Sequence, residues 1–372
     1  TGRGLSPVGG VTRKRSTAPR KHTLHHTTLS MPEKVAIIGS GNWGSAIARI
    51  IGFNAARHDD IETQVNMWVF EEQIDGKNLT EIINETHENV KYLPGVKLPE
   101  NVVAEPDLEK AVTGATLLVF VLPHQFLPRT VPNMKGAYAP NARGISLIKG
   151  IEFVDSKPML ISELIKKEMG GMDIAVLMGA NVANEVAQDQ FCESTVGVRD
   201  LANGAAWKQL FDYPTFRVNV VNDVPGVELC GALKNVVALG AGFCDGLKLG
   251  GNTKAAIIRI GLEEMQKFCH KFYEGVQPAT FFESCGVADL ITTCFGGRNR
   301  KCAEEFAVHE GKKPFDTIEA EMLNGQKLQG TITAKDVMTC LKAAGCVEEF
   351  PLMVKIYMIA FEGTPVAEIV KF

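Results

Sequence analysis

The sequence has 372 residues, 45% of them hydrophobic and 22% charged, which is ordinary for a globular protein long enough to form two domains. No apolar run approaches the roughly 18 residues of a spanning helix, so we expect no membrane-spanning segment. Residues 1–30 carry six Lys or Arg and no acid, so the net charge of −4 leaves about −10 on the remainder, and an acidic body without a basic stripe argues against a nucleic-acid partner.

The first 30 residues are rich in Arg, Ser, Thr, Gly and Pro and show no periodic apolar pattern. This composition predicts a disordered basic extension. It resembles a transit peptide, but it also fits sequence upstream of a natural start at Met31. We favour the second interpretation, and with it a cytoplasmic rather than an organellar location.

Short apolar runs alternate with helical patterns from Met31 to Asn222. The runs predicted as strands are Val35–Ile38, Val65–Phe70, Leu117–Leu122, Ile145–Ile148 and Ile174–Met178, and the predicted helices include Gly44–Phe53, Leu79–Asn84 and Pro158–Met169. Such runs are typical of parallel strands that are buried on both faces. Residues 31–222 are therefore predicted to form a Rossmann-like doubly wound α/β domain.

After Asn222 the strand-like runs disappear. The stretches "GVELCGALKNVVALGAGFCDGL", "TKAAIIRIGLEEMQKFCHKFY" and "TAKDVMTCLKAAG" carry helical spacing. We expect residues 223–372 to form a second, all-α domain.

The stretch "VAIIGSGNWGSAIARI" holds three glycines where the first predicted strand meets the first predicted helix. Gly39, Gly41 and Gly44 have the G-x-G-x-x-G spacing of a dinucleotide-binding turn. There the glycines permit a sharp turn, close approach to a pyrophosphate and tight helix packing. A glycine-rich packing turn is the alternative.

The second predicted strand ends in "MWVFEE". Glu71 or Glu72 stands where an acid can accept a ribose hydroxyl and repel a 2′-phosphate, which favours NAD over NADP. The separation from the glycines is longer than the usual ~20 residues. Phe70 either flanks the adenine or belongs to the core.

Glu228 and Lys234 are the only charged side chains between Val224 and Phe243. Burial disfavours an ammonium ion and lowers the pKa of a lysine, which makes it usable as a general base near neutral pH. A snorkelling lysine or a structural ion pair would explain Lys234 equally well. Lys149 follows an apolar strand, where ligands of open α/β sheets bind, but exposed lysines are also common there.

The segment "GVADLITTCFGGRNRK" combines several polar groups. Asp289 and Thr293 are four residues apart and so share one helical face. A glycine pair followed by Arg298, Asn299 and a predicted helix start has the groups of a phosphate cradle. Each of these groups also has an ordinary surface explanation.

The nine cysteines lie between Cys192 and Cys346, with no CxxC pair and no clustered histidines. This pattern predicts reduced thiols that mostly fill the core, without a disulfide framework or a metal site.

Several segments along the chain are specific enough to point to one family. They are "GSGNWGSAIA", "WVFEE", "LTEIIN", "HENVKYLPG", "PHQF", "GISLIKG", "LMGAN", "GALKNVVALGAGFCDGL", "ESCGVADLITTC", "GGRNRK" and "LNGQKLQG". In this order the sequence resembles the NAD-dependent glycerol-3-phosphate dehydrogenases of eukaryotic cytosol, from Lys34 to about Gly363.

The resemblance implies reversible hydride transfer between C2 of sn-glycerol 3-phosphate and NAD. Lys234 would be the acid/base. Lys149, Asp289 and Thr293 would line the reacting centre, with Lys149 polarising the dihydroxyacetone phosphate carbonyl. The implied substrate-binding residues are Lys149, Asn235, Arg298 and Asn299. The implied NAD contacts are Gly39, Ser40, Gly41, Asn42, Trp43, Gly44, Phe70, Phe126, Ala183, Arg298, Lys327 and Gln329.

The family is typically homodimeric, and its reaction needs no metal because a cationic lysine cluster can stabilise the developing alkoxide. One alternative is a dehydrogenase of the same architecture that acts on a β-hydroxy acid or an acyl thioester, which would leave "GGRNR" unexplained. Another is an inactive NAD sensor or scaffold, against which Lys149, Lys234 and Asp289 argue.

Overall fold

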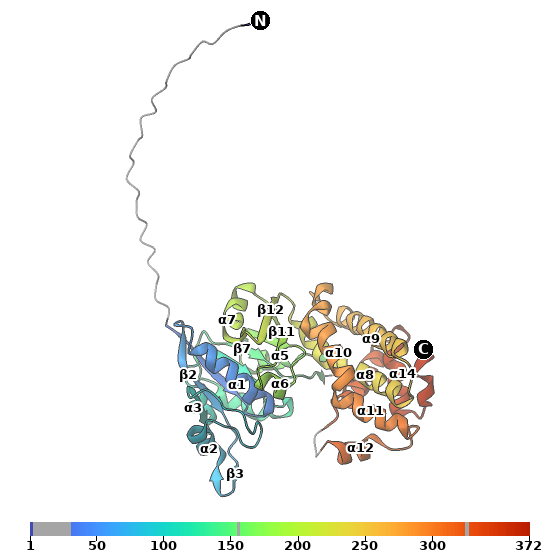
Figure 1. Ribbon diagram of the computed structural model, residues 1–372, viewed down its shortest axis with the longest axis horizontal. Coiled ribbons are helices and arrows are strands. Elements are labelled where there is room, and N and C mark those ends of the chain that lie inside the picture. The colour runs from blue at the N-terminus through green and yellow to red at the C-terminus, as the bar shows by residue number, and fades with distance from the viewer. Residues whose placement is uncertain (3–30, 155–156, 324–326) are drawn as a thin grey trace. The chain divides into compact units, whose positions relative to one another are not determined.

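The computed structural model describes residues 1–2, 31–154, 157–323 and 327–372 (Figure 1). The predicted disorder of residues 1–30 therefore falls almost entirely outside the described residues. Residues Pro32–Phe372 form one compact unit.

An eight-stranded sheet forms the first part of this unit, in the order β12-β11-β10-β7-β6-β1-β2-β5. Its strands are β1 Glu33–Ile38, β2 Ile61–Trp68, β5 Val102–Glu105, β6 Leu117–Phe120, β7 Arg143–Ser146, β10 Ile174–Met178, β11 Cys192–Gly197 and β12 Phe216–Val221. Neighbours are parallel except β10 and β11. The predicted doubly wound sheet is confirmed.

Strand β1 shows why the run Val35–Ile38 is apolar at every position. Val35 and Ile37 belong to the core on one face of the sheet, while Ala36 and Ile38 belong to the core on the other. The helices packed with this sheet are α1 Asn42–Ala55, α2 Leu79–Thr86, α3 Leu108–Val112, α4 Leu127–Thr130, α5 Ile161–Glu168, α6 Ala183–Ala187 and α7 Leu201–Phe211.

Three strands of this sheet were missing from the sequence prediction. β11 and β12 carry polar residues between their apolar ones, β5 is only four residues long, and β5 and β12 are the edge strands. The antiparallel pairing of β10 with β11 was likewise not expected. The helix predicted over Pro158–Met169 begins later, because Lys157–Met159 forms strand β9 in a hairpin with β8 Glu152–Val154.

Helices make up the second part of the unit. They are α8 Val224–Gly246, α9 Gly251–Phe272, α10 Asp289–Gly296, α11 Arg298–Val308, α12 Phe315–Met322, α13 Gln329–Ala343 and α14 Pro351–Phe361. Among the described residues after Asn222 no strand occurs, as predicted.

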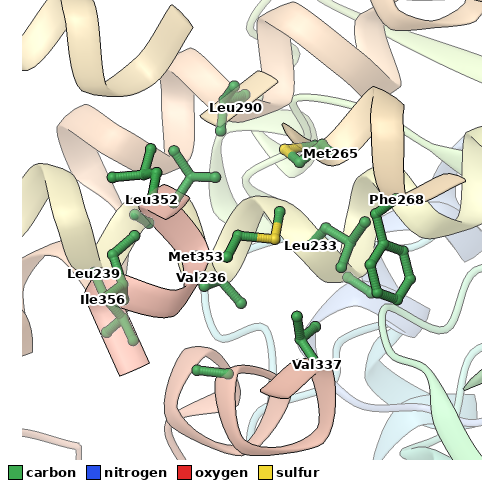
Figure 2. Packing of buried hydrophobic residues seen from close by; sticks show 14 of the residues in the cluster. Leu233, Val236, Leu239, Met265, Phe268, Leu290, Val337, Leu352, Met353 and Ile356 are labelled. Carbon is green, nitrogen blue, oxygen red and sulfur yellow. The ribbon is translucent and has the colours of Figure 1, made fainter. Parts of the chain in front are cut away.

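Helix α8 is the centre of the largest apolar cluster. Figure 2 shows its side chains together with those of α9, α10, α13 and α14; the labelled residues are Leu233, Val236, Leu239, Met265, Phe268, Leu290, Val337, Leu352, Met353 and Ile356. Asp223 caps the helix by accepting hydrogen bonds from the N–H of Gly226 and of Gln277 and from the hydroxyl of Thr280.

This helix corrects the sequence-based statement that no apolar run approaches the length of a spanning helix. With 23 residues and a mean hydropathy of 1.4 in an 18-residue window, α8 is long and apolar enough to cross a membrane. That whole window is buried inside the structure, as is usual for the core helix of a globular fold. The cysteines behave as predicted: all nine are free, and all except the half-buried Cys192 are buried.

Candidate active site

The glycine turn joins β1 to α1 as predicted, and its three glycines have different reasons to be glycine. Gly39 has φ +120°, and a Cβ there would lie 2.9 Å from the backbone N of Leu122. A Cβ on Gly44 would lie 2.5 Å from the carbonyl oxygen of Gly39. A Cβ on Gly41 would meet nothing within 4 Å. Packing therefore explains Gly39 and Gly44, but it gives no reason for Gly41.

The position of this turn fits a ligand site. Gly41 is the N-cap of α1, and no side chain accepts a hydrogen bond at this cap. The first N–H groups of the helix therefore remain available as donors to a ligand. Strands β1 and β6 are neighbours at the point where the strand order reverses. In open α/β sheets this switch point is where ligands bind.

Three further predicted cofactor residues, Ser40, Asn42 and Ala183, lie in the turn or are linked to it by hydrogen bonds. The amide of Asn42 donates to the carbonyl of Tyr92 at 2.7 Å and to Asn184 Oδ1 at 2.9 Å. Because Ala183 and Asn184 are adjacent in α6, this bond joins the start of α6 to the turn. The carbonyl of Ser40 accepts from Ser45 Oγ and from the buried amide of Asn89.

The aromatic candidates differ in their surroundings. Phe70 and Phe126 are 69% and 47% exposed, which excludes the core alternative for Phe70. Trp43 packs against Phe216, with ring centroids 6.3 Å apart. The structure thus leaves the two phenylalanines accessible to a ligand and gives Trp43 a packing role.

The two acids after β2 have protein partners. Glu71 accepts from the backbone N and the hydroxyl of Thr80 in α2. Glu72 accepts from the hydroxyl of Tyr92 and forms an ion pair with Lys91. A ribose hydroxyl would have to compete with these bonds, so the cofactor preference inferred from "FEE" gains no support from the geometry.

Three predicted catalytic residues meet although they are far apart in the chain. Asp289, 2% exposed, is the first residue of α10, and its two carboxylate oxygens take different lysines. Oδ1 is paired with Lys234 Nζ, and Oδ2 lies 3.3 Å from Lys149 Nζ. Thr293 donates its hydroxyl to the carbonyl of Asp289 at 2.6 Å, so the shared helical face is confirmed.

Lys234 is 5% exposed, which excludes the snorkelling alternative. The pKa of its amine is lowered to about 8, mainly by burial. The negative charge of Asp289 raises this pKa, and the nearby positive charge of Lys149 lowers it. Lys234 does form an ion pair, but its partner Asp289 also contacts Lys149, a second predicted catalytic residue. The ion pair is therefore part of the candidate site and does not argue against a catalytic role.

The polar side chains beside Lys234 form a short chain. Asn299 donates its amide N–H to Asn235 Oδ1 at 2.9 Å, and Asn299 Oδ1 accepts from the backbone N of Gly330 at 2.8 Å. Gly330 is the second residue of α13, directly after the candidate Gln329. The side-chain oxygen of Asn299 and one of its two amide N–H groups are thus engaged within the protein, which leaves one amide N–H for a substrate.

The predicted helix start at the glycine pair is confirmed. Gly297 is the N-cap of α11, whose first residue is the exposed Arg298. Helix α11 lies very close to α8, because a Cβ on Gly242 or on Gly246 would lie 2.6 Å from an alanine Cβ of α11. This close approach places the start of α11 beside Asn235. Lys327 is exposed and its amine lies 3.3 Å from Glu319 Oε2.

Sequence reasoning gave no role to two residues that hold this site together. The carbonyl of Gly179, in the segment "LMGAN", accepts from Lys149 Nζ at 3.0 Å. Asn89, in "HENVKYLPG", is fully buried under the glycine turn. Both contacts join residues distant in sequence, so no local pattern marks them.

Comparison with known proteins gives one consistent family. The model described as the N-terminus of NAD-dependent glycerol-3-phosphate dehydrogenase matches residues 34–203, and the one described as its C-terminus matches residues 223–371.

Individual relatives agree over most of their length. The human cytoplasmic glycerol-3-phosphate dehydrogenase [NAD(+)] is 56% identical over 339 residues, which cover 91% of this chain and 96% of the relative. The zebrafish glycerol-3-phosphate dehydrogenase 1-like protein is 57% identical over 92% of this chain and 97% of its own length. The solved glycerol-3-phosphate dehydrogenase of Saccharomyces cerevisiae has a TM-score of 0.87 at 45% identity, covering 91% of this chain and 98% of that one. The chain therefore belongs to the NAD-dependent glycerol-3-phosphate dehydrogenase family.

Proposed function

We propose that this chain is an NAD-dependent oxidoreductase that interconverts dihydroxyacetone phosphate and sn-glycerol 3-phosphate. The observation that carries the proposal is the buried carboxylate of Asp289 between the amines of Lys149 and Lys234. This arrangement provides a proton donor and a second cation at one place, which reduction of a ketone requires.

The glycine turn fits a dinucleotide. Gly41 leaves open space in front of uncapped N–H groups at the start of α1, where a pyrophosphate would be held. Phe70, Phe126, Ala183, Lys327 and Gln329 complete the proposed contacts, with Arg298 shared between cofactor and substrate. The chemistry that NADH supplies when bound is the hydride.

Lys234 is the proposed acid. An amine whose pKa lies near 8 is largely protonated at pH 7 and still gives up its proton readily. It donates to the ketone oxygen of dihydroxyacetone phosphate as negative charge develops there. In the reverse direction the neutral amine removes the proton from the C2 hydroxyl.

Lys149 and Arg298 are proposed to recognise charge on the substrate. Lys149 is held by the carbonyl of Gly179 and by Asp289, which leaves its ammonium beside Lys234 to polarise the same ketone. Arg298, exposed at the start of α11, supplies the guanidinium for the phosphate, with the helix N-terminus adding to the attraction for an anion.

The proposal also covers the roles of the two domains, the oligomeric state and the cellular location. Residues 31–222 form the NAD-binding domain and residues 223–372 the substrate domain. The chain acts as a homodimer. It works in the cytoplasm, as the names of the mouse and human relatives indicate for those proteins.

A steady-state assay tests the proposal. The protein is expected to oxidise NADH with dihydroxyacetone phosphate, but not with unphosphorylated dihydroxyacetone. Turnover with β-keto acids or acyl thioesters and none with the triose phosphate would favour the alternative dehydrogenase. Binding of NADH without turnover on any of these would favour the sensor.

A further inference from the structure

A π-helical turn leads into Asp289. It is η4, Ser284–Ala288, and Asp289 follows it directly as the first residue of α10. Such turns are rare and occur frequently at functional sites. Gly286 has no room for a Cβ beside the carbonyl of Phe281, so the turn is wound tightly against the residues before it. The position of Asp289 therefore depends on what holds this turn.

The hydroxyl of Ser284 ties the turn to two strands of the sheet domain. It donates to the carbonyl of Glu193 in β11 at 2.6 Å, and Oγ accepts from the backbone N of Ala180, just after β10, at 3.3 Å. Ser284 is 7% exposed, so water offers these groups little replacement. Because the hydroxyl proton is used on Glu193, the lone pairs of Oγ are free to accept from Ala180.

The N–H of Ala180 belongs to the same peptide group as the carbonyl of Gly179. A trans peptide is planar, so its N–H and C=O point in opposite directions. Ser284 takes the N–H, and Lys149 Nζ donates to the oxygen at 3.0 Å. The orientation of one peptide plane thus links the Ser284 hydroxyl to the catalytic amine of Lys149.

A second contact holds the next residue of the turn. The backbone N of Cys285 donates to Thr195 Oγ1, also in β11, at 3.2 Å, and Thr195 is fully buried. On the other side of Asp289, Leu290 is fully buried in the core around α8 (Figure 2). Asp289 is therefore held between a pinned turn and a packed helix.

We propose that Ser284, assisted by Thr195, is a positioning residue for the reaction: it aims the Gly179 carbonyl at Lys149 and holds Asp289 between Lys149 and Lys234. The proposal rests on the function proposed above. Ser284 touches neither lysine itself. It acts on Lys149 through the 179–180 peptide and on Lys234 through the turn that carries Asp289.

The consequence for Lys234 has a definite sign. The charged groups that influence its amine are Asp289 and Lys149, and the buried thiol of Cys294 lies close enough for the charge of Lys234 to act on it. Of these, Asp289 stabilises the ammonium form. If the turn loosens and Asp289 moves away, the pKa of Lys234 falls further, and the pH above which ketone reduction fails moves down.

The test is the variant Ser284→Ala, compared with Ser284→Thr and Thr195→Val. In Ser284→Ala we expect kcat for dihydroxyacetone phosphate reduction to fall on the order of tenfold, the rate equivalent of one buried hydrogen bond. We also expect an unchanged KM for NADH, and we expect the alkaline limb of the pH profile of kcat to move toward lower pH. Ser284→Thr, which keeps the hydroxyl, should restore both, and Thr195→Val should shift the limb with a smaller loss of kcat.

Tyr273→Phe is the matched control. It removes a hydroxyl that donates to a backbone carbonyl, that of Pro158 at 2.8 Å, without any contact to the lysines. We expect it to lower Tm without moving the pH profile. A Ser284→Ala enzyme with normal kcat and a normal pH profile would overturn the inference while leaving the function intact.

If the unmodified protein shows no turnover at all, the proposed function fails instead. The positioning role is then decided by a crystal structure of Ser284→Ala. Loss of the Lys149 contact to the Gly179 carbonyl supports it, and retention of that contact at its present 3.0 Å overturns it.

Discussion

The glycine turn at the start of α1 and the lysine cluster around α8 solve opposite problems. The turn is built from six consecutive residues, and what it offers a ligand is backbone N–H groups and empty space. The cluster is built from Lys149, Lys234 and Asp289, which meet only in the folded chain, and what it offers is buried charge. The first works by leaving side chains out. The second works by enclosing side chains that alone would be costly to bury.

The largest effect should come from removing the proposed proton donor of the cluster, Lys234. Lys234→Met is expected to lower turnover on the order of 10²–10⁴-fold, because no proton donor remains, while NADH binding is kept. Lys254→Met is the control, since Lys254 is also buried but pairs with Asp245. Near-normal turnover of Lys234→Met would break the comparison.

The pH dependence of the unmodified enzyme sharpens the same point. Burial lowers the pKa of Lys234 to about 8, so the protonated form is lost as pH rises through that value. Ketone reduction should therefore decline and alcohol oxidation should rise around pH 8, and Lys234→Met should remove both transitions. A reduction rate that stays flat up to pH 10 would contradict the assignment.

The glycine turn should respond in binding alone. Gly41→Ala adds a methyl group to open space, so we expect unchanged Tm and a KM for NADH raised roughly 10- to 100-fold, with kcat at saturation preserved. Gly250→Ala is a matched control. It is also a helix N-cap with an ordinary φ, −67°, and no atom lies within 4 Å of its would-be Cβ. If both variants bind NADH equally well, Gly41 does not face the cofactor.

Arg298→Ala tests whether a single exposed charge recognises the phosphate. We expect the affinity for dihydroxyacetone phosphate to weaken by about 1.5–3 kcal/mol, the usual loss for a charge-assisted bond. Arg259→Ala, on the exposed face of α9 beside Glu263, should leave it unchanged. Inhibition constants of substrate analogues with and without a phosphate would measure the difference.

The smallest expected effect concerns Glu228, the charged residue near the start of α8. Burial raises the pKa of Glu228 from 4.5 to about 7. Its Oε1 accepts from the backbone N of Ser162, while Oε2 has no hydrogen-bond partner among the described residues. Because the folded-state pKa is raised, the stability from this group is present below pH 4.5 and is lost as pH rises through 7.

Glu228→Gln should therefore stabilise the fold by about 1–3 kcal/mol at pH 8 and have little effect at pH 4.5. Glu264→Gln is the contrast, since both oxygens of Glu264 accept backbone N–H groups of α14 at 2.8 Å. That variant should destabilise. Equal responses of the two in thermal melts at both pH values would refute the distinction.

The sequence predicted best what is local. The turn at Gly39–Gly44 and the first two helices have boundaries that differ from prediction by only a few residues, because periodicity and glycine spacing are short-range signals. In β11 and β12 polar residues interrupt the apolar pattern, and β5 is only four residues long and ends in a Glu, so all three were missed. β5 and β12 are the edge strands, and only part of their residues is buried, whereas β11 lies between β10 and β12 and exposes only its first residues.

The site divides in the same way. Lys234 could be singled out as an isolated charge in an apolar helix. The family resemblance implied that Asp289 lines the reacting centre, but its ion pair with Lys234 is visible only in three dimensions. Nothing in the sequence indicates that the amide of Asn299 is used on Asn235 and Gly330, or that Gly179 holds Lys149 by its carbonyl. Backbone acceptors carry no residue type, so sequence patterns cannot reveal them.

The burial of α8 also matters while the protein is being made. This apolar helix leaves the ribosome well before the residues of α14 that cover it, Leu352, Met353 and Ile356. Until those residues emerge, the nascent chain exposes a segment as hydrophobic as a membrane-spanning helix, which favours aggregation and binding by chaperones. A premature stop ahead of α14 should therefore yield insoluble protein rather than a shorter enzyme.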